Sequence, residues 1–271
     1  MTLLSEPQTF RELMTIEQVA ADFFIAQSPD YKWGRLYGGQ VVAQALRAAY
    51  ATVDAPHRVH SLHAYFVLGG VPKQQVLLEV DRLRDGKSFT TRRVVAHQAG
   101  GAILNLNASF HRVEEDVDVQ INGLPDELPS PDDSPSYEWT GIADVREPPK
   151  RTGNGRSWVW MKIREHLGDV DGPDGPLHDC ALAYLSDHNA IDAIVTSHPL
   201  GGGNWEKFMT ASLDHNVWFH RRVRADEWVL FDMQARGLNN ARGIGIGAVH
   251  SVGGVQAATV AQEGLIRAPR T

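Results

Sequence analysis

A segment rich in proline and acidic residues, 113–150, divides the 271-residue chain into two stretches of similar length. Proline fixes φ and has no backbone N–H, so a segment with many prolines does not hold a regular strand or helix for long. Such a composition is typical of an extended linker. We therefore predict an N-terminal domain over 1–112, a linker over 113–150 and a C-terminal domain over 151–271. The prolines in question are Pro125, Pro129, Pro131, Pro135, Pro148 and Pro149.

The two long stretches carry the same order of patterns, which indicates a duplicated unit. Apolar residues at helical spacing predict a buried helix over 39–50 in the first stretch and over 177–195 in the second. Strand-like stretches follow each helix: 61–66 and 76–84 in the first half, 212–219 and 228–236 in the second. A helix followed by several alternating strands is expected in both halves.

This order of elements predicts an α+β protein. One long helix wrapped by an antiparallel sheet is the hot-dog arrangement, and two such repeats in one chain make a double hot dog. The two sheets could join edge to edge, which would protect their edge strands. Sheet-edge pairing and helix stacking also make a homodimer or a homotetramer a reasonable expectation.

Charge and cysteine content limit the expected partners and the expected cellular location. The chain has 26 Lys and Arg against 33 Asp and Glu, a net charge of −7, whereas proteins that bind a phosphate backbone usually carry the opposite bias. We therefore expect no nucleic-acid partner. The single cysteine, Cys180, cannot form an internal disulfide, which favours a cytoplasmic location. No uninterrupted apolar run of 18 residues occurs, and no signal peptide or membrane span is expected.

Five motifs in order along both halves resemble the acyl-CoA thioesterase II family: 37–46, 83–93, 183–189, 212–220 and 260–267. The resemblance implies a double hot-dog enzyme that hydrolyses fatty acyl-CoA to free fatty acid and CoA without a metal, a cofactor or a covalent intermediate. The family's catalytic aspartate corresponds to Asp187, its hydroxyl residue to Ser212 and its glutamine to Gln262. Bacterial relatives often have threonine where this chain has Ser212, and the serine retains the hydroxyl.

The residue types fit this chemistry. Thioester hydrolysis needs a water, a group that deprotonates and orients it, and hydrogen-bond donors for the carbonyl oxygen. Asp187 can accept the proton, while Ser212 and Gln262 can orient the water. Backbone N–H groups near the start of a helix could polarise the carbonyl.

Each of these residues also has a structural interpretation when it is considered alone. Asp187 could end a helix, Ser212 could be an ordinary strand serine, and Gln262 could be a buried hydrogen-bonding residue. The first half has Ala48, Ser61 and Ser109 near the corresponding positions, so it lacks the carboxylate and the amide. We expect one working site per chain, built mainly from the second half.

Two other functions compete with hydrolysis. Hot-dog enoyl-CoA hydratases resemble the chain around Asp187, but they pair the aspartate with a histidine five residues later, and position 192 is Asp here. A non-catalytic acyl-CoA-binding protein would be expected to lack Asp187, Ser212 or Gln262, and all three are present.

Other polar residues give weaker signals. His188, His215 and His220 have no spacing that resembles a closed metal site, and no metal is expected. His63 and His215 are interpreted as structural hydrogen-bonding residues. Three cations near 87–93 are candidates for binding CoA phosphates, although solvated hairpin charges are the stronger interpretation: Lys87, Arg92 and Arg93.

Overall fold

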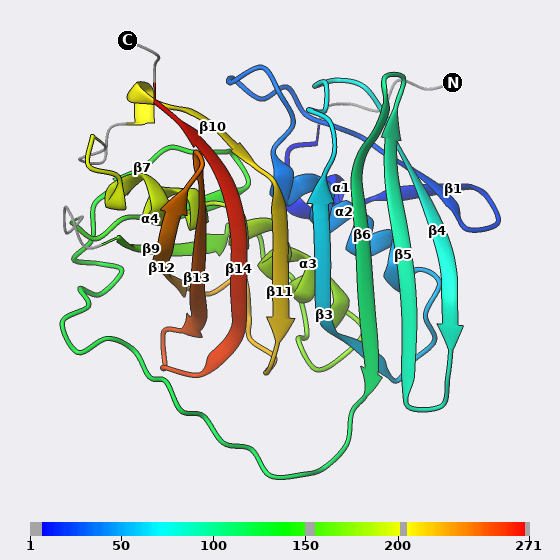
Figure 1. Cartoon of the computed structure of the whole chain (residues 1–271). Helices are drawn as coiled ribbons and strands as arrows, with labels where there is room; N and C mark the ends of the chain where they lie inside the picture. Colours follow the sequence, from blue (N-terminus) through cyan, green and yellow to red (C-terminus); the bar gives the residue numbers. More distant parts are fainter. Residues whose placement is uncertain (1–6, 150–154, 201–204, 269–271) are drawn as a thin grey trace.

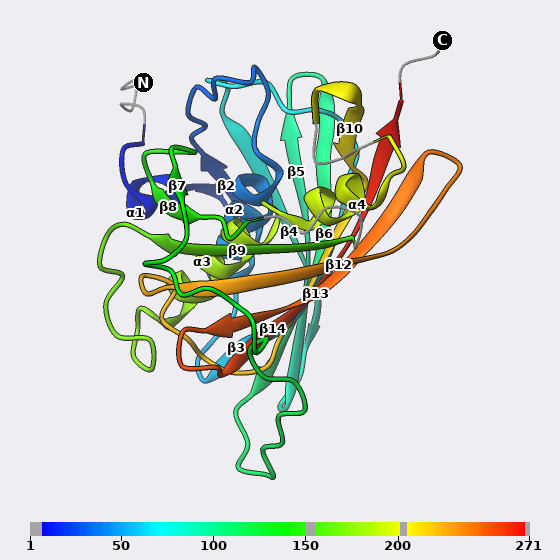
Figure 2. The same cartoon turned by 90° about the vertical axis from the view of Figure 1, so that its left-hand side faces the viewer.

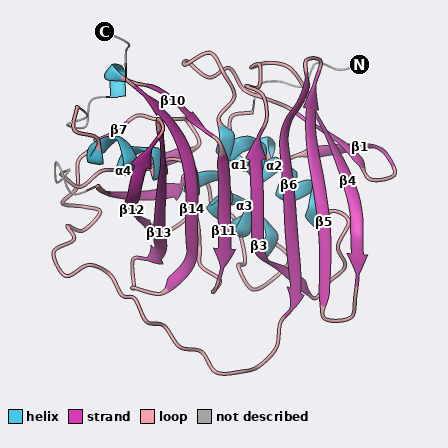
Figure 3. Cartoon of the chain, in the orientation of Figure 1, coloured by secondary structure: helices cyan, strands magenta, loops and turns pink. Residues whose placement is uncertain are grey.

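The computed structural model describes residues 7–149, 155–200 and 205–268 and shows a sheet with helices on one of its sides (Figure 1). Strands account for most of the regular structure (Figure 3). The first half contains α1 Phe10–Leu13, β1 Ile16–Ala20, β2 Phe23–Ala26, α2 Gly38–Tyr50, β3 His57–Phe66, β4 Val76–Asp85, β5 Phe89–Gln98 and β6 Gly101–Arg112. After it come β7 Ser136–Tyr137, β8 Ala143–Arg146, β9 Arg156–Ile163, α3 Gly175–Ser186, α4 Ala190–Ser197, the 3-10 helix η1 Trp205–Lys207, β10 Met209–Ser212, β11 Asp214–Phe219, β12 Val229–Asn239, β13 Arg242–Ser251 and β14 Gln256–Arg267.

The described strands form one antiparallel sheet of 14 strands. Its order is β1-β2-β4-β5-β6-β3-β11-β14-β13-β12-β9-β8-β7, with β10 paired to β14. The middle of this order reads β2-β4-β5-β6-β3 and then β11-β14-β13-β12-β9, so the second half repeats the first in reverse, as a duplicated unit requires. The halves meet where β3 pairs with β11. The sheets therefore join edge to edge, as the sequence suggested.

The strands bury alternate residues against the helices. In β4, Val76, Leu78 and Val80 are buried and alternate with more exposed residues, the pattern of a sheet with one covered face. The sheet twists strongly, so that β12 and β13 run almost across β4 to β6 when the molecule is viewed from the side (Figure 2). The twisted sheet thereby curves around the helices.

The helices differ between the halves. The first half has the expected helix, α2, whose residues are almost all buried and which packs against α3. In the second half the helix predicted over 177–195 is broken into α3 and α4, so its predicted extent is wrong, although α3, with 12 residues, is almost as long as α2, with 13. The break comes at 187–189, Asp-His-Asn, because aspartate and asparagine favour helix ends, where their side chains can bond to other groups. Asn189 Nδ2 donates to the carbonyl oxygen of Phe231 over 3.2 Å.

Residues 113–149 leave β6, pass below the sheet and reach the outer edge of the second half (Figure 1). They include the short strands β7 and β8, and β8 pairs with β9. Gln120 anchors the irregular part, since its Nε2 donates to the Gly254 carbonyl over 2.7 Å. The division into 1–112, 113–150 and 151–271 stays a proposal, and β7 and β8 belong to the sheet of the second half.

No helix among the described residues is long and apolar enough to cross a membrane.

Candidate active site

A cavity of about 650 Å³ lies between the two halves of the chain. The first half supplies much of its apolar lining, and the second half supplies two of the predicted site residues, Asp187 and Ser212. Lining residues from the first half include Leu36, Tyr37, Gly38, Val41, Phe66 and Ile103, and those from the second half include His188, Ile191, Trp205, Thr210 and Ala211. The cavity is thus a shared feature of both repeats.

Asp187 lies at the break between α3 and α4 and is only 8% exposed. Its Oδ2 accepts a hydrogen bond of 2.8 Å from the backbone N–H of Gly39, at the start of α2. Its Oδ1 accepts one of 2.9 Å from Gln262 Nε2. The N-terminal end of a helix carries a partial positive charge, so the α2 terminus also favours the carboxylate.

The two glycines at the start of α2 permit this contact. A Cβ at Gly38 would lie 2.7 Å from Asp187 Oδ2, and one at Gly39 would lie 2.3 Å from the Tyr184 carbonyl oxygen. Any larger residue would push α2 and α3 apart at this end. The contribution of Gly39 was not predicted residue by residue, although Gly38 and Gly39 lie within the 37–46 motif and helix-start N–H groups were expected near the carbonyl.

Ser212 and Gln262 complete the cluster from neighbouring strands. Gln262 lies in β14 and is fully buried, while Ser212 ends β10, which pairs with β14. Gln262 Nε2 donates to Ser212 Oγ over 2.7 Å as well as to Asp187. The structure therefore brings together the three side chains that the sequence singled out.

The environment of Asp187 moves its titration toward neutral pH. Burial disfavours the charged form and raises the pKa of Asp187 to about 7, although hydrogen bonds from Gln262, Gly39 and Ser212 oppose the rise. The positive charge of Arg35 opposes it as well. A carboxylate with a pKa near neutrality can accept a proton from water and release it again at physiological pH.

Aromatic side chains form one wall of the cavity. Tyr37 Oη donates to the Tyr184 carbonyl oxygen over 2.8 Å, which ties α2 to α3. The Trp139 ring lies 4.9 Å from the Tyr37 ring and 4.5 Å from the His188 ring, centroid to centroid. Trp139 belongs to the segment 113–150, so that segment helps to close the cavity.

The three cations considered for binding CoA phosphates, Lys87, Arg92 and Arg93, lie away from this cavity. Arg92 is 1% exposed, and its guanidinium donates hydrogen bonds to Thr52 and Asp85. The interpretation of Arg92 as a solvated charge is therefore wrong. The buried guanidinium is also unavailable to a phosphate. Arg93 bonds to Asp81 and Asn105 on the neighbouring strands. None of these residues lines the cavity.

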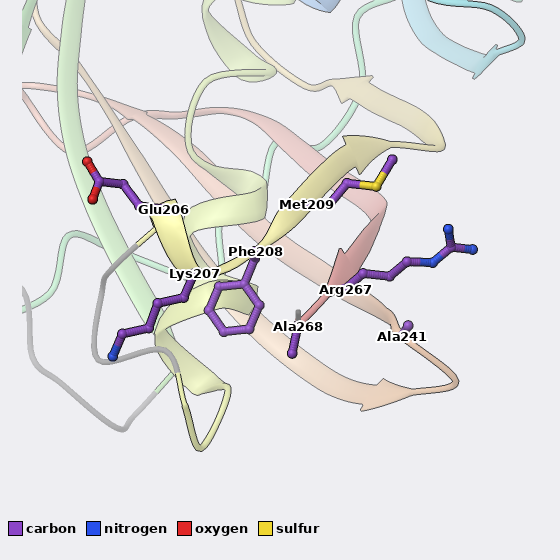
Figure 4. Close-up of a pocket in the computed structure, with 7 residues that line it drawn as sticks. All are labelled: Glu206, Lys207, Phe208, Met209, Ala241, Arg267 and Ala268. Atoms are coloured by element: carbon purple, nitrogen blue, oxygen red, sulfur yellow. The ribbon is translucent and has the colours of Figure 1, made fainter. Parts of the chain in front are cut away.

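A second hollow of about 640 Å³ is lined by residues of η1, β10, the β12–β13 turn and the end of β14. Its two cations, Lys207 and Arg267, point away from each other (Figure 4). They do not converge on a common point, so the hollow lacks the arrangement of an anion site.

Two family models match most of the chain. The acyl-CoA thioesterase N-terminal domain matches residues 27–111, and the acyl-CoA thioesterase C-terminal domain matches residues 120–266. The chain belongs to the acyl-CoA thioesterase II family. The second match of this family begins within the segment 113–150, which contains β7 and β8.

Individual relatives of the thioesterase II family agree with this assignment. The chain is 33% identical to acyl-coenzyme A thioesterase 8 of Mus musculus over 264 residues, covering 86% of this chain and 80% of the relative. The structure of acyl-CoA thioesterase II TesB2 from Mycobacterium marinum superposes with a TM-score of 0.82 at 34% identity, covering 96% of this chain and 97% of the other. A hot dog fold protein from Alicyclobacillus acidocaldarius, at 19% identity, superposes with a TM-score of 0.79, covering 96% of this chain and 98% of the other, and supports the fold alone. The family and the hot-dog fold expected from the sequence are confirmed.

Proposed function

We propose that this thioester hydrolase cleaves fatty acyl-CoA to free fatty acid and CoA, with Asp187 as the general base. The observation that carries the proposal is the buried Asp187 carboxylate, held by Gly39 and Gln262 at a largely apolar cavity beside the Ser212 hydroxyl. An apolar cavity suits a fatty acyl chain, and a carboxylate with a pKa of about 7 suits proton transfer from water.

In the proposed reaction, Ser212 orients a water toward the thioester carbonyl carbon, and Gln262, whose two amide hydrogens go to Asp187 and Ser212, holds both groups in place. Asp187 takes a proton from this water as the new C–O bond forms, and the negative charge collects on the carbonyl oxygen. The tetrahedral intermediate then collapses, the C–S bond breaks, and the proton on Asp187 passes to the thiolate. A thiolate is a good leaving group because thiol pKa values lie near about 8.5, so no stronger acid is needed. The partial positive charge at the start of α2 supports both the carboxylate and the developing oxyanion.

The rival functions predict different products. A hydratase of this fold would need a histidine where Asp192 stands, and Asp192 accepts hydrogen bonds from Ser157 Oγ and Trp205 Nε1, each over 2.8 Å. We expect purified protein to release CoA from palmitoyl-CoA, detected with a thiol-reactive dye. Hydration of an enoyl-CoA without thiol release, or tight binding without turnover, would contradict the proposal.

The raised pKa of Asp187 predicts an acid limb in the pH profile. Because the ionised carboxylate is the active form, kcat/KM should rise with pH up to about 7 and then level off. Below that value it should fall about tenfold per pH unit. Initial rates with palmitoyl-CoA across this range test the prediction, and a profile that stays flat well below pH 7 would exclude Asp187 as the titrating base.

Arg35 is proposed to contact a phosphate of CoA. It is exposed, and among the described residues that line the cavity it is the one arginine or lysine. Measured well above pH 7, where Asp187 is ionised with or without the Arg35 charge, Arg35→Ala should raise KM for palmitoyl-CoA about tenfold with little change in kcat, because it removes a charge-assisted contact to a non-reacting part of the substrate.

The matched control is Lys87→Ala, which removes an exposed cation between β4 and β5, outside the cavity lining. In the same pH range, a palmitoyl thioester of pantetheine, which lacks the nucleotide phosphates, should be hydrolysed equally well by wild type and Arg35→Ala. An equal rise of KM for both thioesters would show that Arg35 does not bind phosphate.

A cytoplasmic location and a homodimer or homotetramer stay predictions of the sequence.

A further inference from the structure

A buried histidine lies directly behind the proposed catalytic cluster. His215, in β11, is fully buried, and its Nδ1 lies 2.6 Å from Gln262 Oε1. Its Nε2 lies 2.7 Å from Oγ of Ser186, the last residue of α3. His215 therefore connects Ser186 to the amide oxygen of Gln262, which points away from Asp187.

The partners determine where the protons are. An amide oxygen only accepts hydrogen bonds, so His215 Nδ1 must carry the hydrogen that is donated to Gln262 Oε1. Burial lowers the pKa of His215 to about 4, and the ring is neutral at physiological pH with Nε2 unprotonated. Nε2 then accepts from the Ser186 hydroxyl, which also lies 3.0 Å from the Ala183 carbonyl oxygen but has one hydrogen to donate.

We propose that Ser186 and His215 are positioning residues that fix the side-chain amide of Gln262 with its NH₂ group toward Asp187 and Ser212. The proposal rests on the proposed function of the site. The two ends of an amide have almost the same shape, so only their hydrogen-bond partners distinguish one orientation from the other. The Nδ1–H of His215 can only donate a hydrogen bond. It therefore favours the orientation in which the Gln262 amide oxygen, and not its NH₂ group, points toward His215.

The alternative orientation would impair the base. A rotated amide would place its oxygen against Asp187 Oδ1, an arrangement that is stable only when Asp187 is protonated. The groups that face Asp187 are Gly39 from α2, Ser212 from β10 and Gln262 from β14, with the neutral Tyr37 hydroxyl and the charge of Arg35 also acting on it. Of these, the Gln262 amide is the one that can turn by 180°, and the fixed orientation keeps the carboxylate ionised.

Two substitutions at His215 separate positioning from packing. His215→Leu fills similar space but lacks the Nδ1–H, and we expect kcat with palmitoyl-CoA to fall about tenfold to hundredfold while KM changes little. The acid limb of the profile should also move to higher pH. His215→Asn places an amide nitrogen close to the position of Nδ1, so it can still donate to Gln262 Oε1 and should recover most of the lost kcat. A kcat of His215→Leu within twofold of wild type, or a change in KM alone, would overturn the proposal.

A measurement without turnover separates this proposal from the proposed function. The ¹⁵N NMR signals of the histidine ring distinguish a protonated from an unprotonated nitrogen, and in the wild type we expect Nδ1 protonated and Nε2 unprotonated for His215. The opposite tautomer would overturn the positioning role even if hydrolysis depends on Asp187. Conversely, the wild type could show the expected tautomer while a variant with Asp187 replaced retains its activity. That pair of results would contradict Asp187 as the base and would leave the hydrogen-bond arrangement of His215 and Gln262 intact.

Discussion

Replacement of Asp187 with asparagine is expected to lower kcat for palmitoyl-CoA about a thousandfold. General-base catalysis contributes about a hundredfold to ten-thousandfold to such reactions, and asparagine cannot take the proton from water. Asparagine keeps the shape of the side chain, so KM should change little. Initial rates of CoA release from palmitoyl-CoA, with kcat and KM fitted separately, measure the effect.

The stability of Asp187→Asn provides an internal control. The pKa of Asp187 rises from 3.8 to about 7 on folding, so folding favours the protonated form. Its stabilising contribution is complete below about pH 4 and is lost as pH rises toward 7. Asp187→Asn, which has no charge to bury, should therefore become more stable than the wild type at neutral pH, as judged by thermal unfolding.

A second control makes the same chemical change elsewhere. Asp144→Asn, in β8, alters a half-exposed carboxylate that pairs with Arg164 outside the cavity lining. It should leave kcat unchanged. Wild-type turnover by a folded Asp187→Asn variant would exclude Asp187 as the base.

Replacement of Gln262 with alanine is expected to lower kcat about a hundredfold. The change removes the donor to both Asp187 and Ser212, and it leaves the His215 Nδ1–H without its acceptor in the interior. Asp187 and Ser212 lose the amide that positions them against the proposed water, and misplacement by about 1 Å can cost two orders of magnitude in rate. Because the Gln262 bond lowers the pKa of Asp187, its loss should also move the acid limb to higher pH. Rates of CoA release as a function of pH measure both effects.

Two variants at this position separate orientation from folding. Gln262→Ala leaves a cavity as well as an unpaired donor, so a loss of stability is expected. Gln262→Leu fills more of this space than Gln262→Ala does. It should therefore be more stable than Gln262→Ala, with an equally low kcat. If either folded variant kept a kcat within twofold of wild type, Gln262 would have no part in the reaction.

Much of the fold follows from patterns that are local in sequence. Alternating apolar residues such as Val76, Leu78 and Val80 predict half-buried strands, and the repeated order of elements predicts two matching halves. The choice of Asp187, Ser212 and Gln262 came from the family resemblance, because each residue alone has an ordinary structural interpretation.

Other features depend on contacts between distant residues. The break between α3 and α4 cannot be predicted from the spacing of apolar residues, because Ile191 and Ile194 continue the helical spacing of α3 in phase. The bond from Gly39 to Asp187 spans 148 positions, and the bond from His215 to Gln262 spans 47. Such partners are set by how α2 packs on α3 and β11 on β14, which no short motif specifies. The burial of Arg92 likewise depends on Thr52, 40 positions away.

The junction of β3 with β11 bears on how a duplicated protein can diverge. In a symmetric homodimer of single repeats, one gene encodes both halves, and every substitution appears at both sites. Here a single polypeptide fuses the halves, keeps them at a high effective concentration and frees each from the other's constraints. One copy could retain the carboxylate at Asp187 while the other specialised in offering the Gly39 N–H to it. Fusion thus permits an asymmetric enzyme that a symmetric assembly of identical repeats could not evolve.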